Sequence, residues 1–111
     1  MLARSLLYMQ PSDGCREDLV AAFERLRIAE TAMEQEGCLG VEMQTRDDPA
    51  APVLVTALWA DRAGYQGWLD NPRREETREE IFSLLTEEPE GIVYDIRVAA
   101  GNPVAASRSQ A

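Results

Sequence analysis

Residues 53–60 decide the fold, because they form an almost uninterrupted apolar run: Val53-Leu54-Val55-Thr56-Ala57-Leu58-Trp59-Ala60. The turn sequence of residues 47–52, with two Asp and two Pro, precedes this run. A short run of this kind is typical of a strand that is covered on both faces. Residues 5–9 are also mostly apolar and end at a Pro-Ser-Asp-Gly turn. We therefore expect two strands at the centre of one sheet.

Two further segments, residues 39–46 and 92–98, alternate apolar and polar side chains. Such alternation predicts strands at the edges of a sheet, with one face buried. Helical spacing of apolar residues predicts one long helix over residues 15–36, which Gly37 ends. Asp61 can cap a short helix that carries Tyr65, Trp68 and Leu69 on one side. A second helical segment is predicted over residues 73–85.

The predicted order is β-α-β-β-α-β, which indicates an α+β, ferredoxin-like domain with an antiparallel four-stranded sheet. We assign this domain to residues 1–99 and expect the Ala/Ser-rich residues 100–111 to form a disordered tail. The two helices of this arrangement can cover only one face of such a sheet. Because the central strands are apolar on both faces, we expect a second copy of the chain to cover the other face in a homodimer.

Composition excludes several classes of function. The chain has 111 residues and a formal net charge of −9, which disfavours nucleic acid and anionic membranes as partners. No apolar stretch approaches the length of a membrane span or of a signal peptide. Two Cys without CxxC spacing fit a reduced, cytoplasmic location. The sequence contains no His, which argues against Ser/Cys–His catalysis, His-ligated haem and the common zinc sites, so we expect no metal and no cofactor.

Three stretches resemble the antibiotic biosynthesis monooxygenase domains, which form dimeric α/β barrels. They are residues 36–41 (EGCLGV), residues 59–69 (WADRAGYQGWL) followed by Asn71, and residues 94–96 (YDI). The resemblance covers about residues 4–98. It implies the ferredoxin-like fold and a sheet-to-sheet dimer, but the superfamily includes haem-degrading oxygenases, cofactor-free oxygenases, isomerases and members without known activity.

The haem-degrading branch would require a Trp at position 59, an Asn in the first strand and a haem-ligating His in the second helical region. Trp59 is present. The Asn position falls near Leu7 and the His position near Arg78, so two of the three residues are missing. The resemblance therefore disfavours haem degradation.

The cofactor-free branch, which oxidises anthrone-like or hydroquinone-like polyketides with O₂, fits better. Its resemblance implies Trp59 and Tyr65 as catalytic residues, since a Trp ending the third strand is followed by a Tyr six residues later. Such a reaction needs a dry cavity, hydrogen-bond donors for the substrate oxygens and a cation that favours the substrate anion. The substrate-binding candidates are these: Arg74, Arg78, Asn71, Trp68 and Tyr8.

Each candidate also has a purely structural interpretation. Trp59 can be a core residue, and Tyr65 and Trp68 can be core or interface residues. Arg78 can pair with Glu75 or Glu79 at the edge of an apolar stripe. The residues do not identify a base, which could be a buried carboxylate or substrate-bound water.

The sequence thus predicts a cofactor-independent monooxygenase that converts an aromatic polyketide to a quinone in secondary metabolism. The alternative is a non-oxidative cyclase or isomerase, or a binding protein for a small aromatic molecule, on the same fold. The substrate itself cannot be read from the residues.

Overall fold

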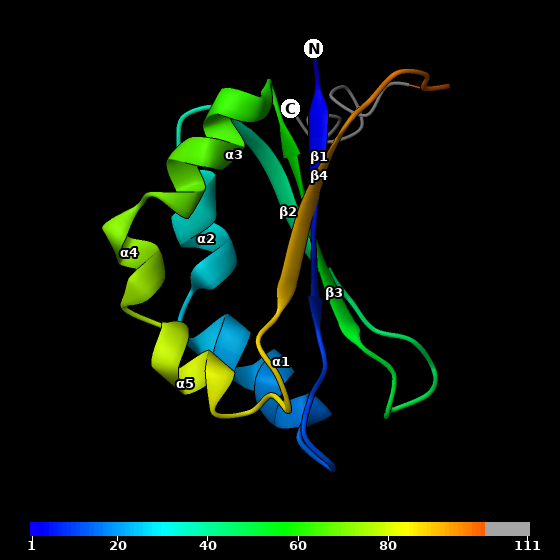
Figure 1. Ribbon diagram of the computed structural model, residues 1–111, viewed down its shortest axis with the longest axis vertical. Helices are drawn as coiled ribbons and strands as arrows, with labels where there is room; N and C mark the ends of the chain where they lie inside the picture. Colours follow the sequence, from blue (N-terminus) through cyan, green and yellow to red (C-terminus); the bar gives the residue numbers. More distant parts are fainter. Residues whose placement is uncertain (102–111) are drawn as a thin grey trace.

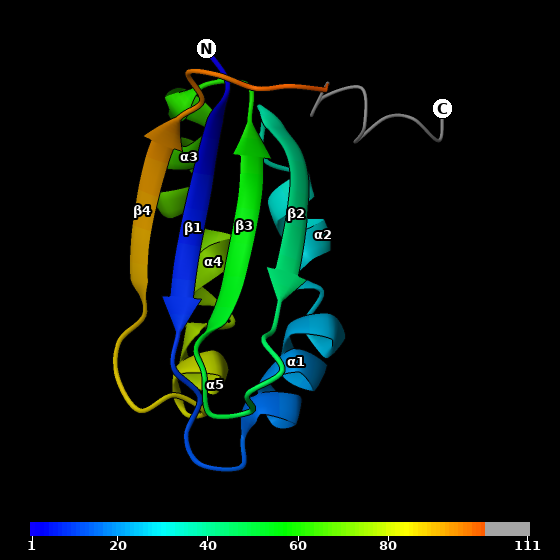
Figure 2. The ribbon, with the colours of Figure 1, turned by 90° about the vertical axis from the view of Figure 1, so that its right-hand side faces the viewer.

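The computed structural model describes residues 1–101 and contains one four-stranded antiparallel sheet. Its strands are β1 (Ala3–Met9), β2 (Cys38–Gln44), β3 (Val53–Trp59) and β4 (Glu90–Asp95), in the order β2-β3-β1-β4 (Figure 2). The two apolar strands, β1 and β3, are central, and the two alternating strands are at the edges. The predicted ferredoxin-like fold is confirmed.

The described part of the chain has five helices, and all of them lie on one face of this sheet (Figure 1). They are α1 (Arg16–Arg25), α2 (Ile28–Met33), α3 (Arg62–Leu69), α4 (Pro72–Glu75) and α5 (Arg78–Phe82). In Figure 2 the opposite face of the sheet is turned to the viewer, and no helix of residues 1–101 covers it. We call this the open face; it carries Leu6 and Tyr8 of β1, Leu54 of β3, and Ile92 and Tyr94 of β4.

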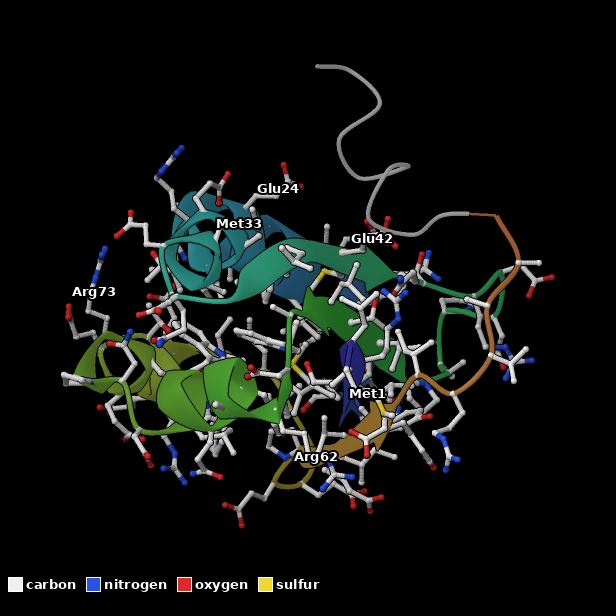
Figure 3. All side chains as sticks on the ribbon, turned by 90° about the horizontal axis from the view of Figure 1, so that it is seen from above. Met1, Glu24, Met33, Glu42, Arg62 and Arg73 are labelled. Atoms are coloured by element: carbon white, nitrogen blue, oxygen red, sulfur yellow. The ribbon has the colours of Figure 1, made fainter. Side chains whose placement is uncertain are left out.

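The single long helix predicted over residues 15–36 is wrong, because the chain breaks into α1 and α2 at Arg27. Arg27 has a left-handed backbone conformation, with φ of 54°, which ends the α1 ladder of hydrogen bonds. Leu26 and Ile28, on either side of it, both pack against buried residues. After the break Ala32 is buried and Met33 is 46% exposed on the outer side of α2 (Figure 3), whereas a continuous helix would bury Met33.

The second predicted helix, over residues 73–85, is also divided. Asn71 caps α4 and Pro72 occupies its first turn, and a new helix, α5, starts after Thr77. The last strand spans Glu90–Asp95 rather than residues 92–98. It ends there because β1 begins at Ala3, which pairs with Asp95; the Ile96 amide adds one more hydrogen bond, to the Leu2 carbonyl at 2.8 Å.

Two groups of buried side chains fill the space between sheet and helices. The solid cluster lies where β1 ends and β3 begins, and consists of Met9, Leu19, Ala22, Val53, Ile81 and Leu85. The aromatic cluster lies at the opposite end of the sheet and consists of Ala3, Ala57 and Trp59, with Tyr65 and Trp68 packed against them. The two clusters occupy opposite halves of the same sheet face.

None of the helices within residues 1–101 combines the length and the hydrophobicity needed to cross a bilayer. Most of the tail expected over residues 100–111 lies outside the described residues.

Candidate functional site

A cavity of about 410 Å³ lies between the sheet and the helices, and both clusters contribute to its walls. Its floor is formed by the central strands, including Ser5, Leu7 and Ala57. Its walls come from Phe23 of α1, Ile28 and Ala32 of α2, and the aromatic residues of α3. A cavity of this size and mostly apolar lining can enclose a small organic molecule.

Trp59 is placed beside this cavity by the end of β3. Its side chain is only 1% exposed, and its indole Nε1–H donates a hydrogen bond to the Ser5 hydroxyl at 2.9 Å. The resemblance implied Trp59 as a catalytic residue, in a reaction that needs hydrogen-bond donors for the substrate oxygens. In the structure the N–H is already engaged within the protein, so Trp59 offers the cavity the face and edge of its ring.

Close packing at Gly64 brings α3 down onto Trp59. A Cβ at Gly64 would lie 2.9 Å from the Glu36 carbonyl oxygen and 3.0 Å from the Trp59 ring, so only glycine fits there. The Asp61 side chain starts α3 by accepting a hydrogen bond from the Ala63 amide at 2.9 Å. As a result the rings of Trp59 and Tyr65 lie 6.0 Å apart and are tilted by 57°, a favourable arrangement for two aromatic rings.

The Tyr65 phenol lies over the last strand, where Gly91 leaves room for it. A Cβ at Gly91 would be 3.2 Å from the Tyr65 hydroxyl oxygen. Burial raises the pKa of Tyr65 above its ordinary value, and the positive charge of Arg74 lowers this pKa in part. Because the raising effect is the larger one, the phenol stays protonated at neutral pH and can donate a hydrogen bond into the cavity.

The two arginines beside the cavity differ in whether their charges are paired with carboxylates of the protein. Arg78 makes ion pairs of 3.3 Å with Glu75 and with Glu88, and its guanidinium stacks on the Phe82 ring at 4.8 Å. Arg74 also lines the cavity. Within residues 1–101 its guanidinium makes no ion pair and no hydrogen bond to the protein. Arg74 is therefore the better placed of the two to meet an anionic ligand group.

Five of the seven sequence-predicted site residues line the cavity: Trp59, Tyr65, Trp68, Arg74 and Arg78. Asn71 does not. It accepts a hydrogen bond from the Arg73 amide at 2.9 Å and donates one to Gln35 at 3.1 Å, which fixes the start of α4 against the end of α2. Arg73 itself points away from the sheet (Figure 3). Tyr8 lies on the open face, 40% exposed, so the sheet separates it from the cavity.

Ser5 is a cavity residue that the sequence reasoning missed. It is the one polar side chain of β1 on the covered face, where it is flanked along the strand by Ala3 and Leu7. A single polar residue on the buried face of an otherwise apolar strand could have marked Ser5 as a candidate site residue. Its partner, Trp59, is 54 residues away, however, and the register that joins them is set by the sheet.

Within residues 1–101 no three His, Cys, Asp or Glu side chains come together in an arrangement that could hold a metal ion. The polar side chains that line the cavity are those of Ser5, Tyr65, Trp68, Arg74, Thr77, Arg78 and Glu88. All of them except the Glu88 carboxylate can donate a hydrogen bond, and Glu88 is ion-paired with Arg78. Donors of this kind suit a ligand that presents acceptor oxygens.

The fold and the cavity together define a ferredoxin-like domain with a ligand-sized space between its sheet and its helices. The sequence model of the family described as "Antibiotic biosynthesis monooxygenase" matches residues 4–80. The chain therefore belongs to this family, as its resemblance indicated. A comparison with curated protein sequences found no match.

Solved structures agree with this fold. A mutant of SnoaB, a cofactor-independent oxygenase from Streptomyces nogalater, superposes with a TM-score of 0.76 at 16% identity, over 91% of this chain and 98% of that chain. Rv0793 from Mycobacterium tuberculosis gives 0.74 at 15% identity, over 91% and 100%. A conserved protein from Methanosarcina mazei gives 0.74 at 14% identity, over 87% and 94%. At these identities the likeness concerns the fold.

Proposed function

We propose that the protein is a cofactor-independent monooxygenase that oxidises an anthrone-like or hydroquinone-like aromatic polyketide to a quinone with O₂. The observation that carries the proposal is the cavity itself, which joins aromatic walls to one cation, Arg74, without an ion-pair partner among residues 1–101. Membership of the family supports the proposal, as does the likeness to SnoaB, a cofactor-independent oxygenase.

In this proposal a flat aromatic substrate lies against the rings of Trp59, Tyr65 and Trp68. Arg74 and the Tyr65 O–H face the substrate oxygen that becomes negatively charged on deprotonation. An opposite charge at close range lowers the pKa of a phenol by about 1–3 units, so Arg74 favours the reactive anion. The proton leaves to water or to a carboxylate.

The substrate anion then transfers one electron to O₂, which gives a substrate radical and superoxide. These two radicals combine into a peroxide bond at the reacting carbon, and the peroxide takes up a proton. Loss of water from the hydroperoxide leaves a carbonyl group. In sum, a CH₂ group and O₂ become C=O and H₂O, and the substrate supplies all the electrons. The protein holds the anion and keeps bulk water out of the cavity.

We further propose that the open face is covered by a second copy of the chain. Tyr8 and Tyr94 on this face are 40% and 59% exposed, and Leu6, Leu54 and Ile92 surround them on neighbouring strands. Exposed aromatic side chains among aliphatic ones on a sheet face without helices are typical of an interface. Sedimentation at micromolar concentration should give about twice 12.4 kDa, and a stable monomer would contradict the dimer.

The free thiols of Cys15 and Cys38 fit the cytoplasmic location that we propose.

The function is tested by oxygen uptake with an anthrone substrate, in protein treated with a metal chelator. We expect one O₂ consumed per quinone formed, with a rate that falls at least tenfold in Arg74→Leu. Anthrone binding without any oxygen uptake would contradict the monooxygenase and support the non-oxidative alternative, a cyclase or a binding protein. Absence of binding would contradict both.

A further inference from the structure

We infer that Ser5 is a ligand-binding residue of the cavity, whose hydroxyl donates a hydrogen bond to a carbonyl or phenolate oxygen on the substrate edge that faces the sheet. The inference rests on the proposed function and deepens it, since it assigns the floor of the cavity a hydrogen-bond donor and the substrate a matching acceptor.

The first observation is the state of the Ser5 hydroxyl. Ser5 is 8% exposed and lines the cavity, and its Oγ accepts the hydrogen bond from the Trp59 indole. A hydroxyl also has one hydrogen to donate. Among the side-chain hydrogen bonds within residues 1–101, Ser5 Oγ takes part only as the acceptor of this one, and its own hydrogen is donated to no protein group. A buried donor without a partner is costly, so this hydrogen is best satisfied by a group inside the cavity.

The second observation is that Trp59 fixes the hydroxyl. Its N–H occupies one lone pair of Ser5 Oγ at 2.9 Å, so the Ser5 hydrogen must turn away from the indole. Because Ser5 lies in a central strand, the neighbouring backbone carbonyls of β3 and β4 belong to the sheet ladder. Accepting a hydrogen bond also makes a hydroxyl a stronger donor. Trp59 thereby acts on the ligand through Ser5.

The third observation concerns what the cavity presents on its other side. Tyr65 and Arg74 belong to α3 and α4 and place donors opposite the sheet, while Ser5 places one on the sheet. The ligand that satisfies both sides has acceptor oxygens at two separate positions on an apolar ring system. An aromatic ketone or quinone with a second oxygen function, or an anionic substituent, has this chemistry.

A matched pair of soluble probes tests the inference: anthraquinone-2-sulfonate and anthracene-2-sulfonate. Both carry the same sulfonate for Arg74 and nearly the same ring outline, and they differ in the two ring carbonyl oxygens. Binding to the full chain is measured by calorimetry for the wild type, Ser5→Ala, Trp59→Phe and the double variant. We expect Ser5→Ala to weaken the quinone about tenfold and to leave the hydrocarbon within about twofold.

Trp59→Phe keeps the Ser5 hydroxyl but frees it to rotate, so we expect a smaller loss for the quinone, about threefold. In the double variant the loss for the quinone relative to the hydrocarbon should equal that of Ser5→Ala alone, because the Trp59 N–H reaches the carbonyl oxygen only through Ser5, whereas the ring contact of Trp59 affects both probes alike. If Ser5 merely accepts the Trp59 hydrogen bond, Ser5→Ala will weaken both probes equally or neither, and the inference is then wrong. If the wild type binds neither probe, the aromatic ligand of the proposed function is wrong as well, which is a different result.

Discussion

The two ends of the space between sheet and helices are filled in different ways. The solid cluster, under α1 and α5, is built from aliphatic side chains and contains no polar group. The aromatic cluster, under α3, is built around Trp59 and includes the buried hydrogen bond to Ser5. The cavity opens between them and takes lining residues from both, such as Met9 from the first and Trp59 from the second.

This difference separates stability from ligand binding along one sheet. Aliphatic side chains without polar groups contribute burial and close packing, so changes in the solid cluster should lower stability. The aromatic cluster borders empty space and holds donors, so changes there should alter binding at a smaller cost in stability. The following predictions test this division, from the largest expected effect to the smallest.

Leu19→Ala should have the largest effect on stability. Leu19 is fully buried in the solid cluster, and truncating such a residue costs about 2–5 kcal/mol because a cavity is left behind. Leu7→Ala is the matched control, since Leu7 is partly buried and already borders the cavity; we expect it to cost less than half as much. Urea unfolding measures both. Equal losses would show that a side chain of the solid cluster that borders the cavity is packed as tightly as one inside that cluster.

Gly64→Ala should destabilise the aromatic end by about 1–3 kcal/mol, because the new methyl group meets the Glu36 carbonyl and the Trp59 ring. Gly67→Ala in the same helix is the control. Its Cβ would meet the Gln35 amide nitrogen, the end of a flexible side chain that can shift at the cost of, at most, its hydrogen bond with Asn71, and alanine favours the helix. Thermal unfolding should therefore show a lower melting temperature only for Gly64→Ala. A loss of the same size at Gly67 would show that α3 tolerates no added volume at all.

Arg74→Leu should weaken the binding of anthraquinone-2-sulfonate about tenfold, because a cation that lies beside an apolar cavity and has no ion-pair partner within residues 1–101 interacts strongly with an anion. Arg78→Leu should weaken it less than about threefold. Its charge is already compensated by Glu75 and Glu88 at the surface, where ion pairs contribute little. Calorimetry over a range of salt concentrations measures both. The reverse order would assign the ligand cation to Arg78.

The smallest predicted effect is on the titration of Tyr65. Its pKa is raised by burial and lowered in part by Arg74, so Arg74→Leu should raise it further. The folded chain then holds the Tyr65 proton more tightly than the unfolded chain. The resulting stability is present below pH ~10, the ordinary pKa of tyrosine, and is lost as pH rises through the folded pKa. Ultraviolet titration of phenolate, as the difference from Tyr65→Phe, measures this pKa; a value below 10 would contradict the prediction.

Much of the sheet could be predicted from the sequence, because strand periodicity reports burial directly. The apolar runs of β1 and β3 required central positions, and alternation in β2 and β4 required edges. The break at Arg27 could not be predicted, since neither Gly nor Pro marks it. Packing on both sides of the break, by Leu26 and Ile28, holds the unusual conformation.

The candidate site could be predicted only in part. Trp59 ends β3, and Tyr65 follows six residues later in the first turns of α3. Because the connection between the two elements is so short, their proximity could be expected. Which of the two arginines lacks an ion-pair partner within residues 1–101 could not be predicted, because Arg78 pairs with Glu88 from the loop before β4. The state of the Trp59 N–H depends in the same way on a residue of another strand, Ser5.

The break at Arg27 also governs the shape of the site from outside it. Phe23 on one side of the break and Ile28 and Ala32 on the other all line the cavity, while Arg27 itself is exposed and does not. The wall opposite the sheet is thus made of two helices that meet at Arg27. A substitution at this exposed position would act on the cavity through the backbone, without replacing any of its lining residues.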